Sequence, residues 1–306
     1  MRQKFLAVVW CLMLVTHAVA QETVIGPLSV CMAENNAPFS SQQPDGMVGY
    51  DVEMTKALAS AMRRELVIVP FESKYENEST LTQEVNALLS SGVCELASGF
   101  ALIAQDLGPP ERPSARVPGY PGAKPPRLRP WIPLQPLTAS DAYQAVVLTL
   151  VVKKSDYSKL TLATPLDARF GAVTGTLGGA ALMLYRGGRL RPQIISLSRN
   201  DDPLQWLEEE RIDAALVTHD RLDLWKQRHP SSLLQSTGYA YPLRMNLGYV
   251  ALSSSAELLE KTNVFLRESA RNGQLAQWAR HAGVTFVLPE PPYVTPSPRM
   301  NDLMLN

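Results

Sequence analysis

The stretch Leu28–Ala59, LSVCMAENNAPFSSQQPDGMVGYDVEMTKALA, decides the fold that we expect for this chain. It opens with a short apolar run typical of a buried strand and ends in a segment whose apolar residues recur at helical spacing. Between them lie Asn35, Asn36 and Phe39, in a loop that contains Pro38. Ligands of open α/β sheets bind beyond the carboxyl ends of the strands, so we expect this loop to face a binding cleft.

The loop admits two interpretations. Its amides can hydrogen-bond a polar ligand while Phe39 covers the apolar part of that ligand. Alternatively, Phe39 closes the top of the neighbouring hydrophobic core. Glu53 is interpreted as a charge in the first turn of a helix, where the helix dipole favours an acid, and not as a site residue.

Length and charge narrow the possible classes of protein. The chain has 306 residues and 45% hydrophobic content, enough for one large domain or two of ordinary size. Lys+Arg and Asp+Glu balance at 29 each. The chain therefore has no excess of basic residues that would indicate nucleic acid as a partner. The sequence also lacks a Cys/His pattern for a metal, and we expect neither a metal nor a cofactor.

The first twenty residues, MRQKFLAVVWCLMLVTHAVA, have the features of a secretory signal. Two cations precede an apolar run, and Ala18-Val19-Ala20 forms a small-residue cleavage site. The apolar run is too short for a membrane span of about 20 residues, and no later segment qualifies. We therefore expect cleavage after Ala20 and an exported protein that is not embedded in the membrane. We also expect it to act in the periplasm, as a monomer.

Removal of the leader leaves Cys31 and Cys94. Each lies on or beside a predicted strand, and cysteines of exported proteins commonly pair. A disulfide bond between them is the first interpretation, and two separate buried thiols are the alternative.

Strand-like and helix-like segments alternate along the rest of the chain, which predicts parallel sheets covered by helices. A proline-rich loop, 108–136, interrupts the first series, and a second series follows it. The β-rich runs at 146–152 and 247–252 lie where the chain passes between the two series. Two α/β units joined by two such strands predict a molecule that bends at a hinge between the units. We interpret the last residues, 289–306, as a tail.

Several stretches, in this order, resemble extracellular solute-binding proteins of family 3, the polar-amino-acid receptors of ABC transporters. The opening stretch resembles the family's strand, Pro-Phe loop and "G-aromatic-D-V-D/E" helix start. The stretches FGAVTGTLGGAALM, WLEEERIDAALVTHD and NLGYVAL, with the helices after NLGYVAL, resemble the second lobe and the closing elements. A partial likeness to proteins encoded with quinoprotein dehydrogenases rests on the two cysteine segments.

The resemblance implies an α/β fold of the two-lobed periplasmic binding protein type II, with two β hinge strands. Lobe one would comprise 22–137 and 253–288, and lobe two 155–241. The lobes would close on a small polar ligand, such as an amino acid, and pass it to a membrane permease.

In the family, an arginine that binds the ligand's carboxylate follows the third strand of lobe one. That strand end reads GFALIAQDLGPPER here, and the matching positions hold Ile103 and Asp106. Arg112 or Arg116 could replace the arginine from the proline-rich loop, or both could be solvated. We still expect the strand end itself to contact the ligand, through Ser98, Gly99 and Phe100.

In lobe two, Thr174, Gly175 and Thr176 lie between a strand and a helix, where free N–H groups suit an anion; an ordinary capped turn is the alternative. The family's acidic anchor corresponds here to Thr218. Asp220 could substitute for it, or it could cap the next helix.

Three functions remain open at this stage. The first is a non-enzymatic receptor of an ABC transporter, and the second is a periplasmic accessory protein of a quinoprotein dehydrogenase that docks through the proline-rich loop. The third is a dehydratase-like enzyme that would use His219 and Asp220 as acid and base.

Overall fold

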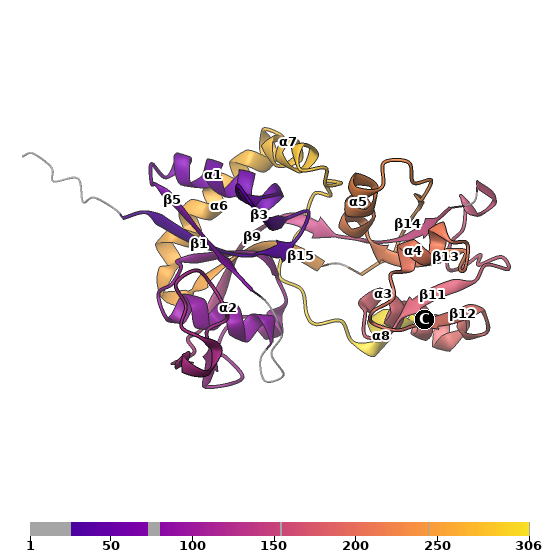
Figure 1. Ribbon diagram of the computed structural model, residues 1–306, viewed down its shortest axis with the longest axis horizontal. Helices are drawn as coiled ribbons and strands as arrows, with labels where there is room; N and C mark the ends of the chain where they lie inside the picture. Colours follow the sequence, from indigo (N-terminus) through magenta and orange to yellow (C-terminus); the bar gives the residue numbers. More distant parts are fainter. Residues whose placement is uncertain (1–25, 73–79, 154, 244, 306) are drawn as a thin grey trace, which may run out of the picture.

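The computed structural model describes residues 26–72, 80–153, 155–243 and 245–305, so the predicted leader lies outside the described residues. Two five-stranded sheets organise these residues into two lobes (Figure 1). We call the part built on the first sheet lobe one and the part built on the second sheet lobe two. Among the residues so described, no helix has the length and apolar character needed to cross a membrane.

Lobe one has the strand order β5-β1-β6-β15-β9. β1 pairs parallel with β5 and β6, and β15 pairs antiparallel with β6 and β9. Residues of α1, α6 and α7 pack on one face of the sheet, and α2 with the proline-rich segment packs on the other. Its elements are β1 (Leu28–Ala33), β2 (Asn35–Asn36), β3 (Ser40–Gln43), β4 (Gly46–Val48), α1 (Tyr50–Ala61), β5 (Leu66–Phe71), α2 (Leu81–Ser90), β6 (Leu96–Ala101), η1 (Ala104–Asp106), β7 (Ser114–Arg116), η2 (Pro126–Leu128), β8 (Trp131–Pro133), β9 (Leu137–Val146), β15 (Met245–Leu252), η5 (Ser253–Ser255), α6 (Ala256–Arg271) and α7 (Gln274–His281).

Lobe two repeats this plan with the order β12-β11-β13-β10-β14. β11 pairs parallel with β12 and β13, and β10 pairs antiparallel with β13 and β14. α3 and α8 pack on one face, and α4 and α5 pack on the other. Its elements are β10 (Leu148–Val152), η3 (Ser155–Tyr157), β11 (Phe170–Val173), α3 (Leu177–Gly188), η4 (Arg191–Gln193), β12 (Ile194–Leu197), α4 (Pro203–Glu208), β13 (Ala214–Thr218), α5 (His219–Arg228), β14 (Gln235–Ala240) and α8 (Met300–Met304).

Neither run predicted to join the lobes is a single strand that passes from one sheet to the other. The run 146–152 becomes the end of β9 in lobe one and then β10 in lobe two, so the first crossing falls at Val147. The run 247–252 lies inside β15, in lobe one, and the second crossing falls between β14 and β15. The expected boundaries were displaced because an apolar run shows that a segment is buried, but not which sheet buries it.

The proline-rich segment is ordered against lobe one. β7 and β8 form a short antiparallel ribbon that contacts α2. The side chain of Asn86 in α2 donates to the carbonyl of Gln135 at 2.8 Å and accepts from its N–H at 3.2 Å. Proline cannot supply ladder N–H groups, and each strand of the ribbon is accordingly three residues long.

The last residues do not form the free tail that the sequence predicted. Thr295 pairs with Ile103 in an isolated parallel bridge, and α8 packs on α3 of lobe two. Leu303 is 8% exposed and lies in the lobe-two core. The tail interpretation failed because the run 300–304 is too short to show a helical period by itself.

The predicted disulfide is confirmed. Cys31 and Cys94 are bonded, with their Cα atoms 5.7 Å apart and a sequence separation of 63. The bond joins the middle of β1 to the turn that leads into β6, and these two strands are neighbours in the sheet. It therefore ties together two parallel strands of the lobe-one sheet.

Candidate functional site

The lobe-one edge is formed where β1 and β6 end. Asn35 and Asn36 form the short strand β2, not an open loop, and pair with β3. Gly99 has a φ of +71°, and a Cβ atom there would lie 3.0 Å from Oδ2 of Asp51 and 3.3 Å from Nδ2 of Asn36. Its N–H donates to the hydroxyl of Tyr143 at 2.8 Å. Glycine thus allows the end of β6 to lie directly over a buried carboxylate.

That carboxylate, Asp51, has no exposed surface, and neither of its oxygens meets the geometry of a hydrogen bond. Burial raises the pKa of Asp51 to about 7, and the nearby hydroxyls of Tyr143 and Ser98 offset this only in part. Burial disfavours the charged form because a low-dielectric interior cannot replace the hydration of an anion. The lobe-one edge therefore rests on a carboxyl group that is partly protonated near neutral pH.

The two aromatic residues predicted to contact a ligand are core residues. Phe39 is 5% exposed, and its ring centre lies 6.4 Å from that of Tyr50. Phe100 is 3% exposed and packs on the opposite face of the sheet. For Phe39 the core interpretation holds, because its side chain packs in the lobe-one core beside Tyr50. Both side chains face inward, which leaves Asn36 and the backbone of Gly99 at this edge.

The proline-rich loop does not supply the arginine that the family pattern requires. The guanidinium of Arg116 lies 5.3 Å from the ring centre of Trp131 within the β7–β8 ribbon, and Arg112 is exposed on the segment before that ribbon. At the matching positions, Ile103 pairs with Thr295, and Asp106 accepts a hydrogen bond from Thr82 at 2.8 Å. These residues hold the fold of lobe one.

In lobe two, Thr174, Gly175 and Thr176 are exposed between β11 and α3, as predicted. The hydroxyl of Thr176 caps the helix by accepting from the N–H of Gly179 at 3.1 Å. Gly175 has a φ of +78°, and a Cβ atom there would lie 2.8 Å from Nε of Arg199. The guanidinium of Arg199 therefore lies against the turn at the helix N-terminus, and both features favour an anion.

A cavity of about 240 Å³ lies at these strand ends and is lined by lobe-two residues, among them Thr176, Thr218, Arg199 and Arg221. Arg221 forms an ion pair with Asp202 at 3.2 Å. For Arg199, no ion pair is found within the described ranges. An exposed, unpaired guanidinium beside a helix N-terminus can bind a carboxylate or a phosphate in bidentate fashion.

Thr218 lines this cavity and occupies the N-cap position of α5, whereas Asp220 lies in the first turn of that helix. Asp220 therefore does not take the N-cap position that the sequence offered it. Burial raises the pKa of Asp220 and lowers that of His219. Neither side chain lines the cavity, so the pair is not placed as an acid and base beside a bound substrate.

Over the described ranges, no group of three or more His, Cys, Asp or Glu residues could hold a metal ion.

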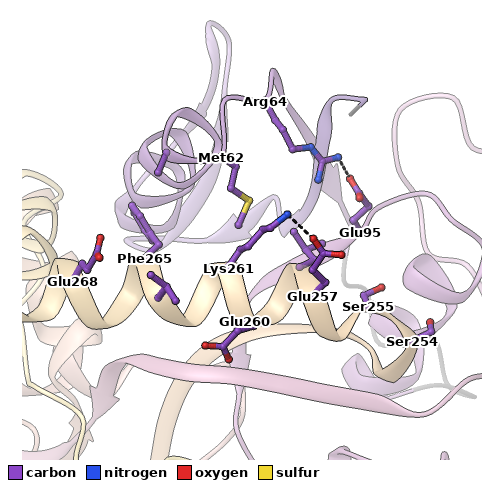
Figure 2. Close-up of a pocket in the computed structure, with 13 residues that line it drawn as sticks. Met62, Arg64, Glu95, Ser254, Ser255, Glu257, Glu260, Lys261, Phe265 and Glu268 are labelled. Carbon is purple, nitrogen blue, oxygen red and sulfur yellow. Dashed lines mark hydrogen bonds and ion pairs between the residues drawn. The ribbon is translucent and has the colours of Figure 1, made fainter. Parts of the chain in front are cut away.

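A larger cavity, of about 750 Å³, lies on lobe one between the end of α1 and α6 (Figure 2). Its cations are already engaged: Arg64 pairs with Glu95 at 2.5 Å, and Lys261 pairs with Glu257 at 2.7 Å. This groove is formed by helix surfaces and not by strand ends. Both of its cations are paired with carboxylates of the same groove, so we do not assign the ligand site to it.

Sequence reasoning missed Arg199 and Arg221. Arg199 comes two residues after the strand that ends at Leu197, and Arg221 comes three residues after the strand that ends at Thr218. Carboxyl ends of parallel strands meet at one edge, so arginines directly after these strands were a usable signal. The family pattern directed attention to lobe one instead.

Comparisons with known structures agree with this two-lobed fold. No family model and no curated protein matches the sequence. The L-cystine solute receptor of Neisseria gonorrhoeae, in its unliganded open conformation, has a TM-score of 0.60 at 16% identity, over 86% of this chain and 96% of its own. An ancestral cationic amino acid solute-binding protein has a TM-score of 0.58 at 17% identity, and the match covers 84% of this chain and 95% of that protein. An ancestral cyclohexadienyl dehydratase has a TM-score of 0.54 at 17% identity, and the match covers 84% of this chain and 92% of that enzyme.

At these identities the similarity shows the fold alone. The chain has the two-lobed α/β fold of periplasmic binding proteins. The similar structures include receptors for amino acids, and the dehydratase shows that the same fold can also carry an enzyme.

Proposed function

We propose that this chain is an exported solute-binding receptor whose lobes close on a small polar ligand with an anionic group. The observation that carries the proposal is the lobe-two cavity, in which Arg199 lies beside the N-terminus of α3. The backbone N–H groups of a helix N-terminus and a guanidinium are suitable donors for a carboxylate. Asn36 and the backbone at Gly99 would complete the site from lobe one.

The lobe-two edge would dominate binding, because the family's lobe-one arginine is absent from the matching positions. An amino acid or a related organic acid fits this arrangement, with its carboxylate on Arg199 and Thr176. As in the receptors that the sequence resembles, the closed form would deliver the ligand to the permease of an ABC transporter. The receptor would act in the periplasm, after cleavage behind Ala20, and as a monomer.

Isothermal titration calorimetry of the purified mature chain tests the proposal. The panel should contain amino acids, opines and small organic acids. Once a ligand is found, Arg199→Ala should weaken its affinity by about 10- to 100-fold, the usual effect of removing a charge-assisted hydrogen bond. Lys226→Ala, on the exposed part of α5, is the matched control and should leave the affinity unchanged. Absence of binding across the panel would count against the proposal.

A second function is favoured by one surface. Around the β7–β8 ribbon, Leu128 is 68% exposed and Trp131 is 50% exposed, and Arg127 and Arg129 flank Leu128. Exposed aromatic and arginine side chains are typical of protein interfaces. If the chain serves a periplasmic dehydrogenase, this surface would dock to it. Trp131→Ala should then weaken binding of that dehydrogenase and leave ligand affinity intact.

A further inference from the structure

The two faces of the β7–β8 ribbon differ in character. Because β7 and β8 pair in antiparallel fashion, side chains opposite one another lie on the same face, and successive pairs alternate between the two faces. Ala115 and Ile132 form one such pair and pack in the lobe-one core. The next pair, Arg116 and Trp131, is exposed. The ribbon is therefore anchored to lobe one by one face and presents the other to its surroundings.

Charge of one sign gathers in the segment that contains the ribbon. The stretch 112–140 contains five Lys or Arg residues and no Asp or Glu, although the whole chain balances 29 basic against 29 acidic residues. Three of these cations, those of Arg116, Lys124 and Arg127, are exposed. The segment therefore carries a concentrated positive charge on a chain that is otherwise acidic.

Large apolar side chains are exposed among these cations. Leu128, in η2, is 68% exposed, and it follows Arg127 directly in the sequence. Trp131, three residues later, is 50% exposed, and its ring lies 5.3 Å from the guanidinium of Arg116. Apolar groups that are exposed together and flanked by charged groups mark interaction sites more often than single exposed residues do.

The chain between the two strands of the ribbon is held in place by its own contacts. Nε of Arg129 donates to the carbonyl of Lys124 at 2.9 Å, and the guanidinium of Arg129 lies near Glu72, because both side chains approach Gly119. Five prolines in the stretch 125–136 fix their φ angles. A surface that is already ordered loses little conformational entropy when it binds a partner.

A bilayer with anionic headgroups is the partner whose chemistry matches this surface. Protein interfaces arrange charges of both signs, which fixes register and orientation, whereas the exposed charges of this surface are positive. An anionic bilayer presents one sign of charge over a wide area and attracts Lys and Arg side chains. Trp side chains favour the level of the headgroups, and Leu side chains favour the boundary with the acyl chains.

We infer that the face formed by Arg116, Lys124, Arg127, Leu128 and Trp131 docks the protein on an anionic phospholipid bilayer. This contact is peripheral and needs no membrane-spanning helix, because it combines attraction between charges with shallow burial of two apolar side chains. It goes beyond the proposed receptor function and does not depend on which ligand the protein binds. A protein partner, such as the dehydrogenase considered above, is the competing occupant of the same face.

Vesicle sedimentation tests the inference with the purified mature chain. The chain should sediment with phosphatidylcholine vesicles that contain about 30% phosphatidylglycerol and remain in solution with vesicles of phosphatidylcholine alone. Raising the salt concentration to about 0.5 M should release it, because the charges are then screened. The double variant Lys124→Gln, Arg127→Gln should bind about 30-fold more weakly, because each cation near an anionic surface contributes about a factor of five. Trp131→Ala should bind about tenfold more weakly, because its apolar surface is no longer buried.

Matched variants on lobe two control for general charge and apolar content. The double variant Lys226→Gln, Arg228→Gln removes the same two charges from exposed positions of α5, and Leu233→Ala removes an apolar side chain that is 70% exposed. Both should bind as the wild type does. An environment-sensitive fluorophore attached at Leu128→Cys should brighten on anionic vesicles, and the same fluorophore at Leu233→Cys should not.

Two results would overturn the inference. If the wild type does not sediment with the anionic vesicles, the face does not dock on a bilayer and a protein partner becomes its occupant. If the lobe-two variants lose as much binding as the ribbon variants, general charge and not this face causes the binding. The vesicles contain no ligand for the cavity beside Arg199, so either result leaves the proposed receptor function to be judged by its own titration.

Discussion

The strand ends of lobe one and of lobe two differ in their chemistry. Lobe one buries a carboxyl group, Asp51, under Gly99 and presents mainly amide and backbone groups. Lobe two exposes guanidinium groups, those of Arg199 and Arg221, beside a helix N-terminus. The comparison teaches that the lobe-one edge is shaped by the packing of its own core. The lobe-two edge exposes the guanidinium of Arg199, for which no ion pair is found among the described residues.

Loss of the disulfide should have the largest effect and should act on lobe one. In the Cys31→Ser, Cys94→Ser double variant, the unfolded chain gains freedom, and the free energy of unfolding should fall by about 4 kcal/mol. Urea unfolding followed by the fluorescence of Trp278, which packs against the lobe-one core, measures this change once the other tryptophans are replaced by phenylalanine. If lobe one is no less stable without the bond, the disulfide is not what holds its edge.

Asp51→Asn should produce the next largest effect, and this effect should depend on pH. The pKa of Asp51 is raised to about 7 in the folded protein from 3.8, so the folded state holds its proton more tightly than the unfolded state. The wild type should therefore lose stability as the pH rises from about 4 to about 7, on the order of 2–4 kcal/mol.

The asparagine variant lacks this titration, so its stability relative to the wild type should increase between pH 4.5 and pH 8. Urea midpoints at several pH values within this range measure the difference. Glu53→Gln, at an exposed position on the same helix, is the control for the change from carboxylate to amide itself. A flat difference between Asp51→Asn and the wild type would show that the carboxyl group is not the cause.

Gly99→Ala should cost less, roughly 1–2 kcal/mol, because a positive φ strains an L-residue. Its methyl group would also lie 3.0 Å from Oδ2 of Asp51. Thermal unfolding measures the loss. Gly92→Ala provides a comparison, because Gly92 also has a positive φ (+72°) but its Cβ would meet nothing within 4 Å. Equal losses in the two variants would mean that contact with Asp51 contributes nothing.

Arg199→Ala should have the smallest effect on stability, within about 0.5 kcal/mol, as is usual for an exposed side chain. The same change should weaken ligand binding strongly, as proposed above. Differential scanning calorimetry without ligand measures the stability. A large loss of stability here would remove the contrast between the two edges, since Arg199 would then be part of the lobe-two framework.

Much of the fold was predictable from local patterns. Strand and helix segments, the pairing of Cys31 with Cys94 and the order of the two α/β units follow from apolar spacing, cysteine positions and motif resemblance. The turn at Thr174–Thr176 was placed correctly between a strand and a helix. Each of these features depends on residues close together in the sequence, or on the two cysteines that lie outside the predicted leader.

The candidate site was predicted less well. Asn36 and Gly99 lie at the lobe-one edge as expected, but Phe39 and Phe100 are core residues. The direction in which an aromatic ring points at the end of a strand depends on how side chains pack across the sheet, and this packing is not visible in the local sequence. Arg199 was missed because its position beside Gly175 follows from the adjacency of β11 and β12, and not from sequence distance.

The sequence by itself determined that the chain alternates strands with helices, that two of its three cysteines lie on or beside predicted strands and that two similar units follow each other. Only the tertiary structure decided that the run 146–152 is divided between two sheets, that 300–304 returns to lobe two as a helix, and that a carboxyl group is buried under Gly99. The physical reason is that local patterns encode which residues avoid water, whereas pairing between distant strands decides where each of them is buried.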